Sequence, residues 1–439
     1  MTRRRIRLAA SFSVLSLGIA GTSAQAADRI SLDEALRLAR AANARLPIAA
    51  VEVGIAEQRR AEARAGRWLK VALEGDFIYA PASGYDPILT NLGEERQQIV
   101  LRQPIYEGGA RRAAVAEADA RIAASRARLR AAERDVELEV RSRFSELVEA
   151  LEEAAIRREG IERLRTYRTS LESRRTAGQG LAADILKTDI RIAAEEESVL
   201  DAGRRAAEAR LELNDLMGRD PAAPLEPEPP AEPEEPAAPA GEPWIAAPEL
   251  AEAQAEVRAA DAAVATARSE GKPRVSVAAD AGFWGSDTTR LIPPDLEERH
   301  PGATFSDRVR RDAGYSFRLE FSWPVWDFGA IQARIAQSEL SLEESRRRVE
   351  LERRRSRLEW SKADEARRSL YRSIRLLSRS VPDARDAYLA VESRYRGGTA
   401  TSLEVLDAYA ASIEAAVRLA NAVARYRVAD ATRLRWGSP

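Results

Sequence analysis

Two very long segments of this chain place apolar residues at helical spacing. They run from Glu107 to about Thr176 and from Gly329 to about Arg396, and both are rich in Ala, Arg, Glu and Leu. At a rise of about 1.5 Å per residue, some 70 residues form a helix of roughly 100 Å. A helix of that length exceeds what a compact domain needs, so the pattern predicts an elongated molecule.

Inside each long segment, apolar residues recur at every seventh position. They are Val115, Ile122, Leu129 and Val136 in the first segment, and Ile335, Leu342 and Val349 in the second. A seven-residue repeat is typical of a coiled-coil seam. Alanines flank this seam, which allows neighbouring helices to approach closely on more than one side.

Each long helix is followed by a glycine-containing break and then by a second helical pattern. The breaks lie at 177–180 and 397–398. Short loops between long helices make antiparallel hairpins. We therefore predict two long helical hairpins, at about 107–217 and about 329–436.

Ahead of each long helix, the apolar period falls from helical spacing to two. After a preceding helix, at Ser31 to about Arg64 or Pro248 to about Glu270, the alternation predicts β-hairpins at about 69–105 and 273–325. The clearest strand, Tyr315 to Trp323, has apolar side chains on one face and polar ones on the other. The apolar face could pack on the core of a soluble protein, or it could contact lipid. Two hairpins cannot close a barrel, so strands in a membrane would have to come from several chains.

The two halves are copies of one unit. At a constant offset of 220 residues, Pro104 matches Pro324 and Gly109 matches Gly329, and the register persists to the glycine breaks. We therefore expect a first repeat at 27–218 and a second at 248–439. A segment rich in proline and glutamate, 219–247, joins them as an extended polyproline or disordered linker.

The N-terminus predicts export. Four arginines precede an apolar run that ends at Ala24-Gln25-Ala26, which is the pattern of a secretory signal peptide at 1–26. The chain has no cysteine, which excludes disulfides and thiolate chemistry. Its one histidine, His300, cannot build a histidine-rich metal site. A net charge of −1 gives no basic excess for nucleic acid. We expect no enzyme activity, no cofactor and no metal.

The order of helix, β-hairpin and long helical hairpin, repeated after a linker, resembles the TolC-like outer membrane efflux proteins of Gram-negative bacteria, the outer membrane factors. The sharpest match is the stretch YRGGTATSLEVLDA, Tyr395 to Ala408. The strand-helix junctions at Pro104, Gly109, Pro324 and Gly329 support it. The resemblance implies a mostly α fold with membrane β, in which a homotrimer shares one outer-membrane barrel and a periplasmic helical tunnel. Each chain would contribute four β-strands and the two tandem repeats of coiled-coil-like hairpins.

The same resemblance implies site residues near the hairpin turns. Glu404 and Asp407 match the two acidic rings of the periplasmic aperture, whereas from spacing alone they are ordinary first-turn acids that complement the helix dipole. Tyr395 and Asp184 match a gating pair joined by a hydrogen bond. The gating arginine of the family would fall at Ala400, so Arg396 or Arg175 would have to replace it.

The turns themselves match the surface that meets a periplasmic adaptor in this family. Their glycines are Gly178, Gly180, Gly397 and Gly398. The function implied is passive export of small molecules or proteins, in a tripartite efflux or type I secretion system with an inner-membrane pump. Other expected partners are further copies of the chain and outer-membrane lipid, but not nucleic acid. The alternative is a periplasmic coiled-coil adaptor or structural protein without a pore.

Overall fold

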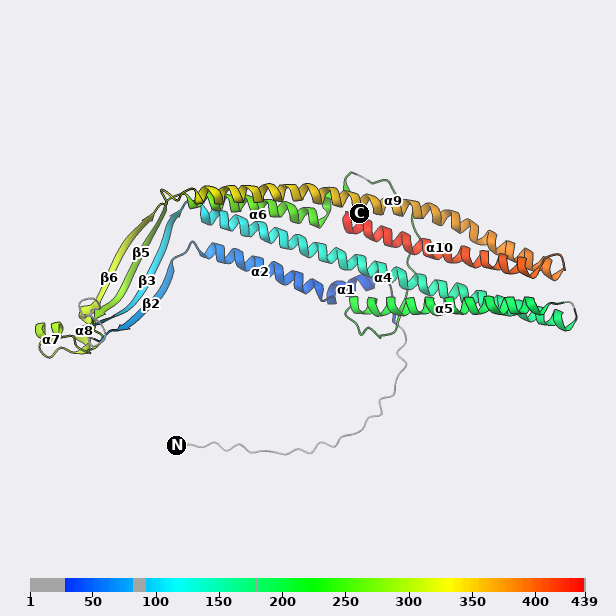
Figure 1. Ribbon diagram of the computed structural model, residues 1–439, viewed down its shortest axis with the longest axis horizontal. Helices are drawn as coiled ribbons and strands as arrows, with labels where there is room; N and C mark the ends of the chain where they lie inside the picture. The colour runs from blue at the N-terminus through cyan, green and yellow to red at the C-terminus, as the bar shows by residue number, and fades with distance from the viewer. Residues whose placement is uncertain (1–27, 82–91, 179, 240, 438–439) are drawn as a thin grey trace, which may run out of the picture.

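Two helical hairpins of equal dimensions dominate the structure (Figure 1). In this computed structural model, which describes residues 28–81, 92–178, 180–239 and 241–437, the long arms are α4 (Ala110–Thr176) and α9 (Ala330–Arg396). Each contains 67 residues, and the returning arms α5 (Ala182–Leu216) and α10 (Ser402–Trp436) contain 35 each. The equal lengths follow from the constant offset between the repeats. The predicted signal peptide lies outside the described residues.

Shorter helices accompany the long arms. They are α1 (Leu32–Ala42), α2 (Arg45–Ala65) and α6 (Pro248–Glu270), the last preceded by the 3-10 turn η1 (Pro243–Ala246). The sequence predicts one helix from Ser31 to Arg64, which is wrong, because Asn43 interrupts it in an extended conformation. The Asn43 amide donates to the Leu216 carbonyl, and its side-chain oxygen accepts from the Arg45 N–H. None of the helices in the described part of the chain combines the length and the apolar composition that crossing a membrane requires.

One antiparallel sheet forms the opposite end of the molecule from the hairpin turns (Figure 1). Its order is β2 (Lys70–Tyr79), β3 (Gly93–Glu107), β5 (Arg274–Ser286) and β6 (Ala313–Ser322). The β3–β5 pair joins the hairpins of the two repeats into this single sheet. Within the described residues, β2 and β6 are the two edges of the sheet, each with a partner strand on one side only.

The sheet has one apolar face, which no other part of the described chain covers. Its residues are Val71, Leu73, Phe77, Tyr79, Ile99, Tyr315, Phe317, Leu319 and Phe321, all exposed. The other face is polar: Arg96 donates to Asp76 at 2.9 Å, and Arg318 pairs with Asp280 at 2.9 Å. A contiguous exposed apolar surface of this kind marks a site of contact with lipid or with another protein. The alternation of apolar and polar side chains is thus confirmed, but the apolar side chains are exposed and not buried against the rest of the described chain.

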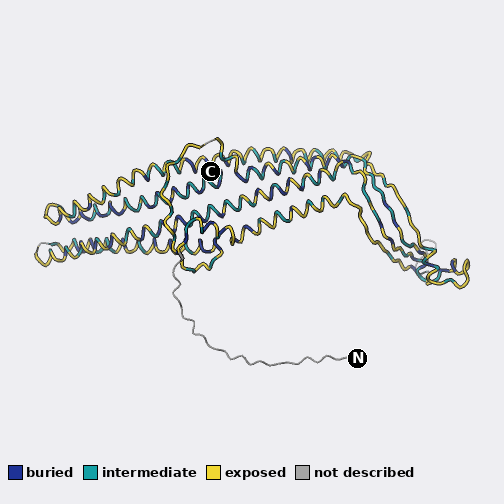
Figure 2. The backbone as a smooth tube through the Cα atoms, turned by 180° about the vertical axis from the view of Figure 1, so that it is seen from behind, coloured by how far each residue is buried: buried dark blue, intermediate teal, exposed yellow. Residues whose placement is uncertain are grey.

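The two long arms differ in their surroundings, although the sequence pattern treats them alike. Helix α4 packs against α2, α5, α6 and α10, whereas α9 has α6 and α10 as its main neighbours. Of the predicted seam residues, Val136 and Ile122 of α4 and Leu342 of α9 are buried, and the others are half-buried. Away from the seam, much of α9 remains exposed (Figure 2). Helix α4 is therefore central, and α9 is an edge.

The linker is fastened to the helices. Its strand β4 (Leu225–Pro227) pairs in parallel with β1 (Asp28–Ile30). Further along, the Tyr426 hydroxyl on α10 donates to the Glu234 carbonyl at 2.7 Å. Near the end of the linker, Trp244 packs on Trp360 of α9 with ring centroids 5.5 Å apart. Of the two predicted alternatives, the described residues of this segment match the extended connector.

The long connection between β5 and β6 is folded. It contains α7 (Pro294–Arg299) and α8 (Phe305–Asp312), which sequence patterns do not distinguish from a charged loop. The buried Arg308 organises it, because its guanidinium donates to the Arg290 carbonyl at 2.6 Å and pairs with Glu95 of β3 at 2.9 Å.

Candidate functional site at the hairpin turns

The two hairpin turns have the same backbone construction. Gly178 and Gly398 both adopt a φ of +77°, a left-handed conformation that glycine adopts without steric cost. Their N–H groups donate to the carbonyls of Arg175 and Tyr395, each at 3.0 Å. The first turn is tighter, because a Cβ on Gly180 would lie 2.8 Å from the Arg175 nitrogen. The glycine pattern of the sequence therefore reflects real constraints on the turns.

Helix α10 begins with a complete capping box. The Glu404 N–H donates to the Thr401 hydroxyl at 3.3 Å, and the Glu404 carboxylate accepts from the Thr401 N–H at 2.8 Å. Glu404 and Asp407 are both exposed and lie one helical turn apart, so they share a face of α10. Glu404 thus stabilises the helix start, and both carboxylates remain accessible.

The first repeat carries different chemistry at the equivalent positions. Leu181 stands where Thr401 caps the second helix, and it supplies no side-chain cap to α5. Asp184 corresponds to Glu404, and Lys187 corresponds to Asp407. Charge near the tips therefore differs between the two hairpins of one chain.

Tyr395 is buried between the hairpins, 8% exposed. Its ring meets Tyr167 of α4 edge-on at 5.4 Å, and the Arg174 guanidinium lies 4.7 Å from its centroid. No hydrogen bond joins Tyr395 to Asp184 within the described residues. Burial raises the pKa of the Tyr167 hydroxyl.

At the turns, Arg174 contacts the other hairpin. Its Nη2 atom donates to the carbonyl of Arg396 at 2.6 Å. The two replacements considered from the sequence are placed otherwise: Arg396 pairs with Glu392 of its own helix at 2.6 Å, and the exposed Arg175 makes no ion pair within the described part. Ala400 packs against the apolar core below the turns. Sequence reasoning missed Arg174, although its equivalence to Arg394 was visible in the repeat.

An aromatic core lies directly beneath the turns and joins all four arms. Its buried residues are Leu164, Tyr167, Leu171, Ile185, Tyr388, Tyr395, Val405, Tyr409 and Ile413. Gly160 of α4 permits the closest approach, since a Cβ there would lie 2.4 Å from the Tyr409 hydroxyl. The tips are therefore positioned by a packed core rather than by isolated polar contacts.

The strand-helix junctions at the far end are also paired. Gly109 and Gly329 have φ values of +97° and +86° and directly precede α4 and α9. Pro324 follows the end of β6, whereas Pro104 lies inside β3, which continues to Glu107 after an irregularity in register. The proline of the predicted junction therefore follows the strand in the second repeat, whereas in the first repeat the strand continues past it. A bulge lets the strand pass Pro104, which has no N–H to donate.

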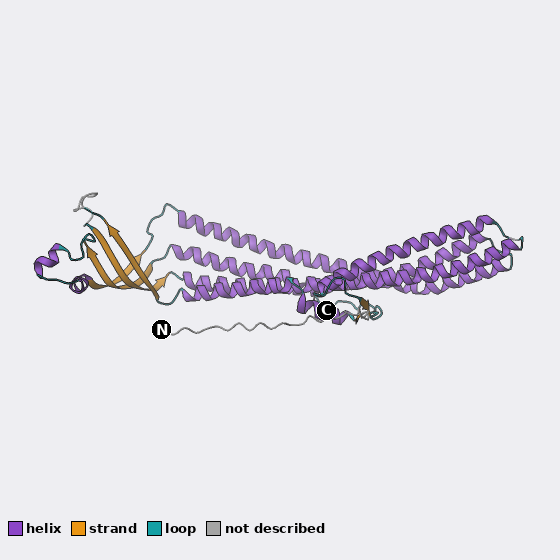
Figure 3. Cartoon of the chain, turned by 90° about the horizontal axis from the view of Figure 1, so that it is seen from below, coloured by secondary structure: helices purple, strands orange, loops and turns teal. Residues whose placement is uncertain are grey.

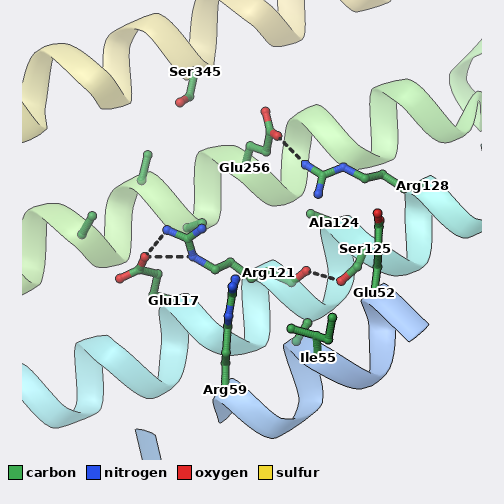
Figure 4. A pocket seen from close by; sticks show the side chains of 14 residues that line it. Glu52, Ile55, Arg59, Glu117, Arg121, Ala124, Ser125, Arg128, Glu256 and Ser345 are labelled. Carbon is green, nitrogen blue, oxygen red and sulfur yellow. Dashed lines mark hydrogen bonds and ion pairs between the residues drawn. The ribbon is translucent and has the colours of Figure 1, made fainter. Parts of the chain in front are cut away.

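A polar cavity of about 510 Å³ lies between the turns and the sheet, among α2, α4 and α6, and one side chain of α9 also lines it (Figure 4). Its charged residues are mostly paired: Arg121 with Glu117 at 2.6 Å, and Arg128 with Glu256 at 3.1 Å. Across the described residues, no group of three or more His, Cys, Asp or Glu side chains is placed to hold a metal ion. The arrangement offers ion pairs, not an acid-base site.

Comparison with known proteins gives one family match. Residues 245–434, which span nearly all of the second repeat, match the family described as outer membrane efflux protein. No curated relative matches the chain.

Solved structures resemble the chain over nearly its full length. The outer-membrane channel OprN is 21% identical with a TM-score of 0.77, covering 92% of this chain and 89% of its own. CusC, whose structures describe its folding and transmembrane channel formation, is 17% identical with a TM-score of 0.81. The match covers 93% of this chain and 92% of CusC. The outer membrane protein VceC from Vibrio cholerae is 17% identical with a TM-score of 0.76, covering 92% and 95%. At these identities the structures establish the fold.

Proposed function

We propose that this chain is a TolC-like outer membrane efflux protein, three copies of which form one passive duct from the periplasm to the cell exterior. The family match covers the second repeat, and the first repeat has the same elements at the same offset. The fold of the whole chain is that of the outer membrane channels. Efflux across the outer membrane is the function of the family; the residue roles and partners below are proposals.

The sheet is the observation that carries this proposal. Its apolar face is fully exposed, with Tyr315 87% and Leu73 78% exposed, and its opposite face is lined by ion pairs. Lipid covers such a face, and water in a lumen covers the other. The free edges β2 and β6 must be paired in a membrane, because unpaired backbone groups are too costly there. Pairing β2 of one copy with β6 of the next closes a barrel from three sheets.

The helices of the three copies would also close into a continuous ring, through contacts between their edge helices. Edge helices carry apolar residues that stay exposed in the described part of the chain: Ile48, Val51 and Ile55 on α2, Leu186, Ile190 and Leu200 on α5, and Leu340, Leu351, Leu358, Leu376 and Leu389 on α9. Next to the sheet, the outer helices are α2 and α9, and next to the turns they are α5 and α9 (Figure 1). Contact between the α9 edge of one copy and the α2 and α5 edge of the next buries these residues and continues the barrel as a tunnel.

The duct needs no chemistry of its own. The carboxylates of Glu404 and Asp407, repeated in three copies around the mouth, would favour cations over small anions. The turns containing Gly178, Gly180, Gly397 and Gly398 would meet a periplasmic adaptor, through which an inner-membrane pump supplies the energy. We therefore propose transport without catalysis.

The decisive experiment is single-channel recording of the detergent-extracted protein in a planar bilayer under a salt gradient. A stable, cation-preferring conductance from a trimer is the expected result. A soluble, non-trimeric particle that never inserts would instead support the rival function, a periplasmic coiled-coil adaptor or structural protein. The exposed apolar sheet argues against that rival, since it would remain in water.

A further inference from the structure

A groove that the proposed function does not use lies beside the linker, partway along the helices. Figure 3 shows the linker and the β1–β4 pair against one side of the helices, between the sheet and the turns. The groove has a volume of about 770 Å³, which is within the range of pockets that bind small organic ligands. Residues of α4, α9 and α10 form its walls, and Glu232 and Pro233 of the linker line it as well.

The floor of the groove is apolar and is built from three helices. Its largest apolar residues are Ile156, Tyr371, Ile374, Val381, Leu419 and Val423. Ile374 is buried, and the others are half-buried. Four of them belong to one hydrophobic cluster, which joins α9 to α10, so packing holds this surface in place. Such a surface gains free energy when it covers an alkyl chain or an aromatic ring.

The groove also carries arginines without partners. Arg375 and Arg379 line it from the same face of α9, one helical turn apart, where like charges repel. Within the described residues, neither side chain makes a hydrogen bond or an ion pair. The arginines that precede them on α9, Arg367, Arg368 and Arg372, all pair with acids. Two neighbouring guanidinium groups are therefore left without an ion-pair partner in the described part of the chain.

The first repeat shows that this pair is particular to α9. At the offset of 220 residues, Ala155 and Glu159 of α4 stand at the positions of Arg375 and Arg379. Glu159 pairs with Arg163 of its own helix. Helix α4 therefore balances its charge at this level, whereas α9 presents two unpaired cations.

The remaining charged groups of the groove do not neutralise these cations. Arg427 of α10 donates to the carbonyls of Pro230 at 3.2 Å and Ala231 at 3.3 Å, and burial lowers its pKa. The carboxylates that line the groove are Glu152 and Glu232. Burial raises the pKa of Glu152, and Glu232 is exposed on the linker. Neither carboxylate forms an ion pair within the described residues, so the groove keeps a surplus of positive charge above its apolar floor.

From this combination we propose that the groove binds a free anionic amphiphile. The alkyl or aromatic body lies on the apolar floor, and the anionic head group lies between Arg375 and Arg379. Guanidinium groups recognise such anions through paired, charge-assisted hydrogen bonds. A lipid of the bilayer is not the occupant, since Tyr371 lies roughly 60 Å along α9 from Gly329 at the sheet. The site is built within one chain, so it does not depend on the proposed duct.

The test is photo-crosslinking of the full-length protein, purified in a non-ionic detergent. The probe is decanesulfonate with a diazirine at the end of its alkyl chain, and the control probe is decyltrimethylammonium with the same diazirine. Mass spectrometry identifies the labelled peptides. The sulfonate is expected to label 371–381 of α9 and 416–427 of α10, and the ammonium should label them roughly fivefold less. The exposed apolar sheet should react equally with both probes and serves as the internal reference.

Two variants separate the charge from the apolar floor. Arg375→Gln together with Arg379→Gln should reduce labelling of the groove by the sulfonate roughly tenfold, because both anion contacts are lost. Ala416→Phe should also reduce it, by filling the groove while both arginines stay. The matched control is Arg346→Gln together with Arg353→Gln, which should label as the wild type does. These arginines are exposed on α9 and unpaired within the described residues, but they do not line the groove.

Two outcomes overturn the site. One is equal labelling of the groove by the two probes, which would leave only non-specific apolar contact. The other is full labelling of the variant that lacks Arg375 and Arg379. Thermal unfolding of every variant identifies a folding defect, and if Ala416→Phe does not fold, the double arginine variant decides alone. Selective labelling in a protein that forms no channel would contradict the proposed function and leave this inference standing.

Discussion

Small residues decide where the helices of this chain come closest. Gly160 lies in the middle of α4, where glycine ordinarily weakens a helix, but Tyr409 and Ile413 of α10 occupy the space that a side chain would need. Gly203 of α5 is also helical, and no atom lies within 4 Å of the position its Cβ would take. The two glycines therefore have opposite roles: one permits packing, and the other only costs helix propensity.

This contrast predicts stability changes of opposite sign. Gly160→Ala should destabilise the protein by about 1–3 kcal/mol through overpacking against Tyr409. Gly203→Ala should stabilise it by about 0.5–1 kcal/mol, because alanine favours the helix and nothing obstructs it. Thermal unfolding of both variants beside the wild type measures the difference. Equal shifts in the same direction would show that the α4–α10 contact is looser than described.

The acidic pair on α10 predicts ion selectivity. Glu404→Gln together with Asp407→Asn should lower the ratio of cation to anion permeability by roughly two- to fivefold, since the charges at the mouth are removed. Glutamine is chosen because it can still accept the Thr401 N–H and keep the capping box. Reversal potentials in a salt gradient report the ratio. Unchanged selectivity would remove both residues from the constriction.

At the scale of elements, the linker is a fastened segment of the fold. Polyproline composition shows that it cannot build a core, and the structure shows that it still contributes contacts. Tyr426 of α10 donates to the Glu234 carbonyl, and Arg427 donates to the Pro230 carbonyl at 3.2 Å. Burial lowers the pKa of the half-buried Arg427.

Removing one of these bonds should loosen the linker. Tyr426→Phe is expected to cost about 0.5–1.5 kcal/mol, the usual net value of such a hydrogen bond. It should also speed cleavage of the linker by a protease that cuts after glutamate. Tyr371→Phe is the control, because its ring packs beside Tyr426 but its hydroxyl makes no hydrogen bond within the described residues. Identical digestion of both variants would argue that the linker is held by other contacts.

Much of the element order follows from sequence periodicity, but the neighbours of each element do not. The repeat pattern predicts two equal hairpins, four strands and their glycine junctions, and these are present. It cannot show that α4 becomes central and α9 an edge, because both carry the same heptad pattern. Nor does it reveal Arg174, since a charged residue at a helix end has the same appearance whether it meets water or another chain segment. Those facts depend on contacts between distant residues.

At the scale of the whole molecule, the exposed apolar rows indicate an incomplete assembly. Leu358 of α9 is 52% exposed, and Leu351, one heptad earlier, is 63% exposed. Single exposed leucines are ordinary, but a row along an edge helix that faces away from its own chain marks an interface. The sheet edges at β2 and β6 give the same indication at the other end.

Introducing charge into this row should oppose assembly. Leu358→Glu is expected to reduce the trimer fraction markedly, because the carboxylate would be buried between copies without a partner. Leu291→Glu makes the same change in the connection between β5 and β6, where the leucine is 68% exposed, and should leave the trimer intact. Chemical cross-linking or native mass spectrometry counts the copies. A trimer that tolerates Leu358→Glu would place the interface elsewhere.

The two repeats in one chain also determine how uniform the mouth can be. Six identical hairpins would surround the axis with six identical tips, and every substitution would appear six times. In the proposed trimer, fusion of two hairpins into one chain lowers that symmetry, so that the tip with Glu404 and Asp407 would alternate with a tip carrying Asp184 and Lys187. Acidic and mixed sectors would then follow one another around the opening. The charge of one tip can differ from that of the other, while residues of both repeats, Tyr167 and Tyr395, form the contact between the hairpins.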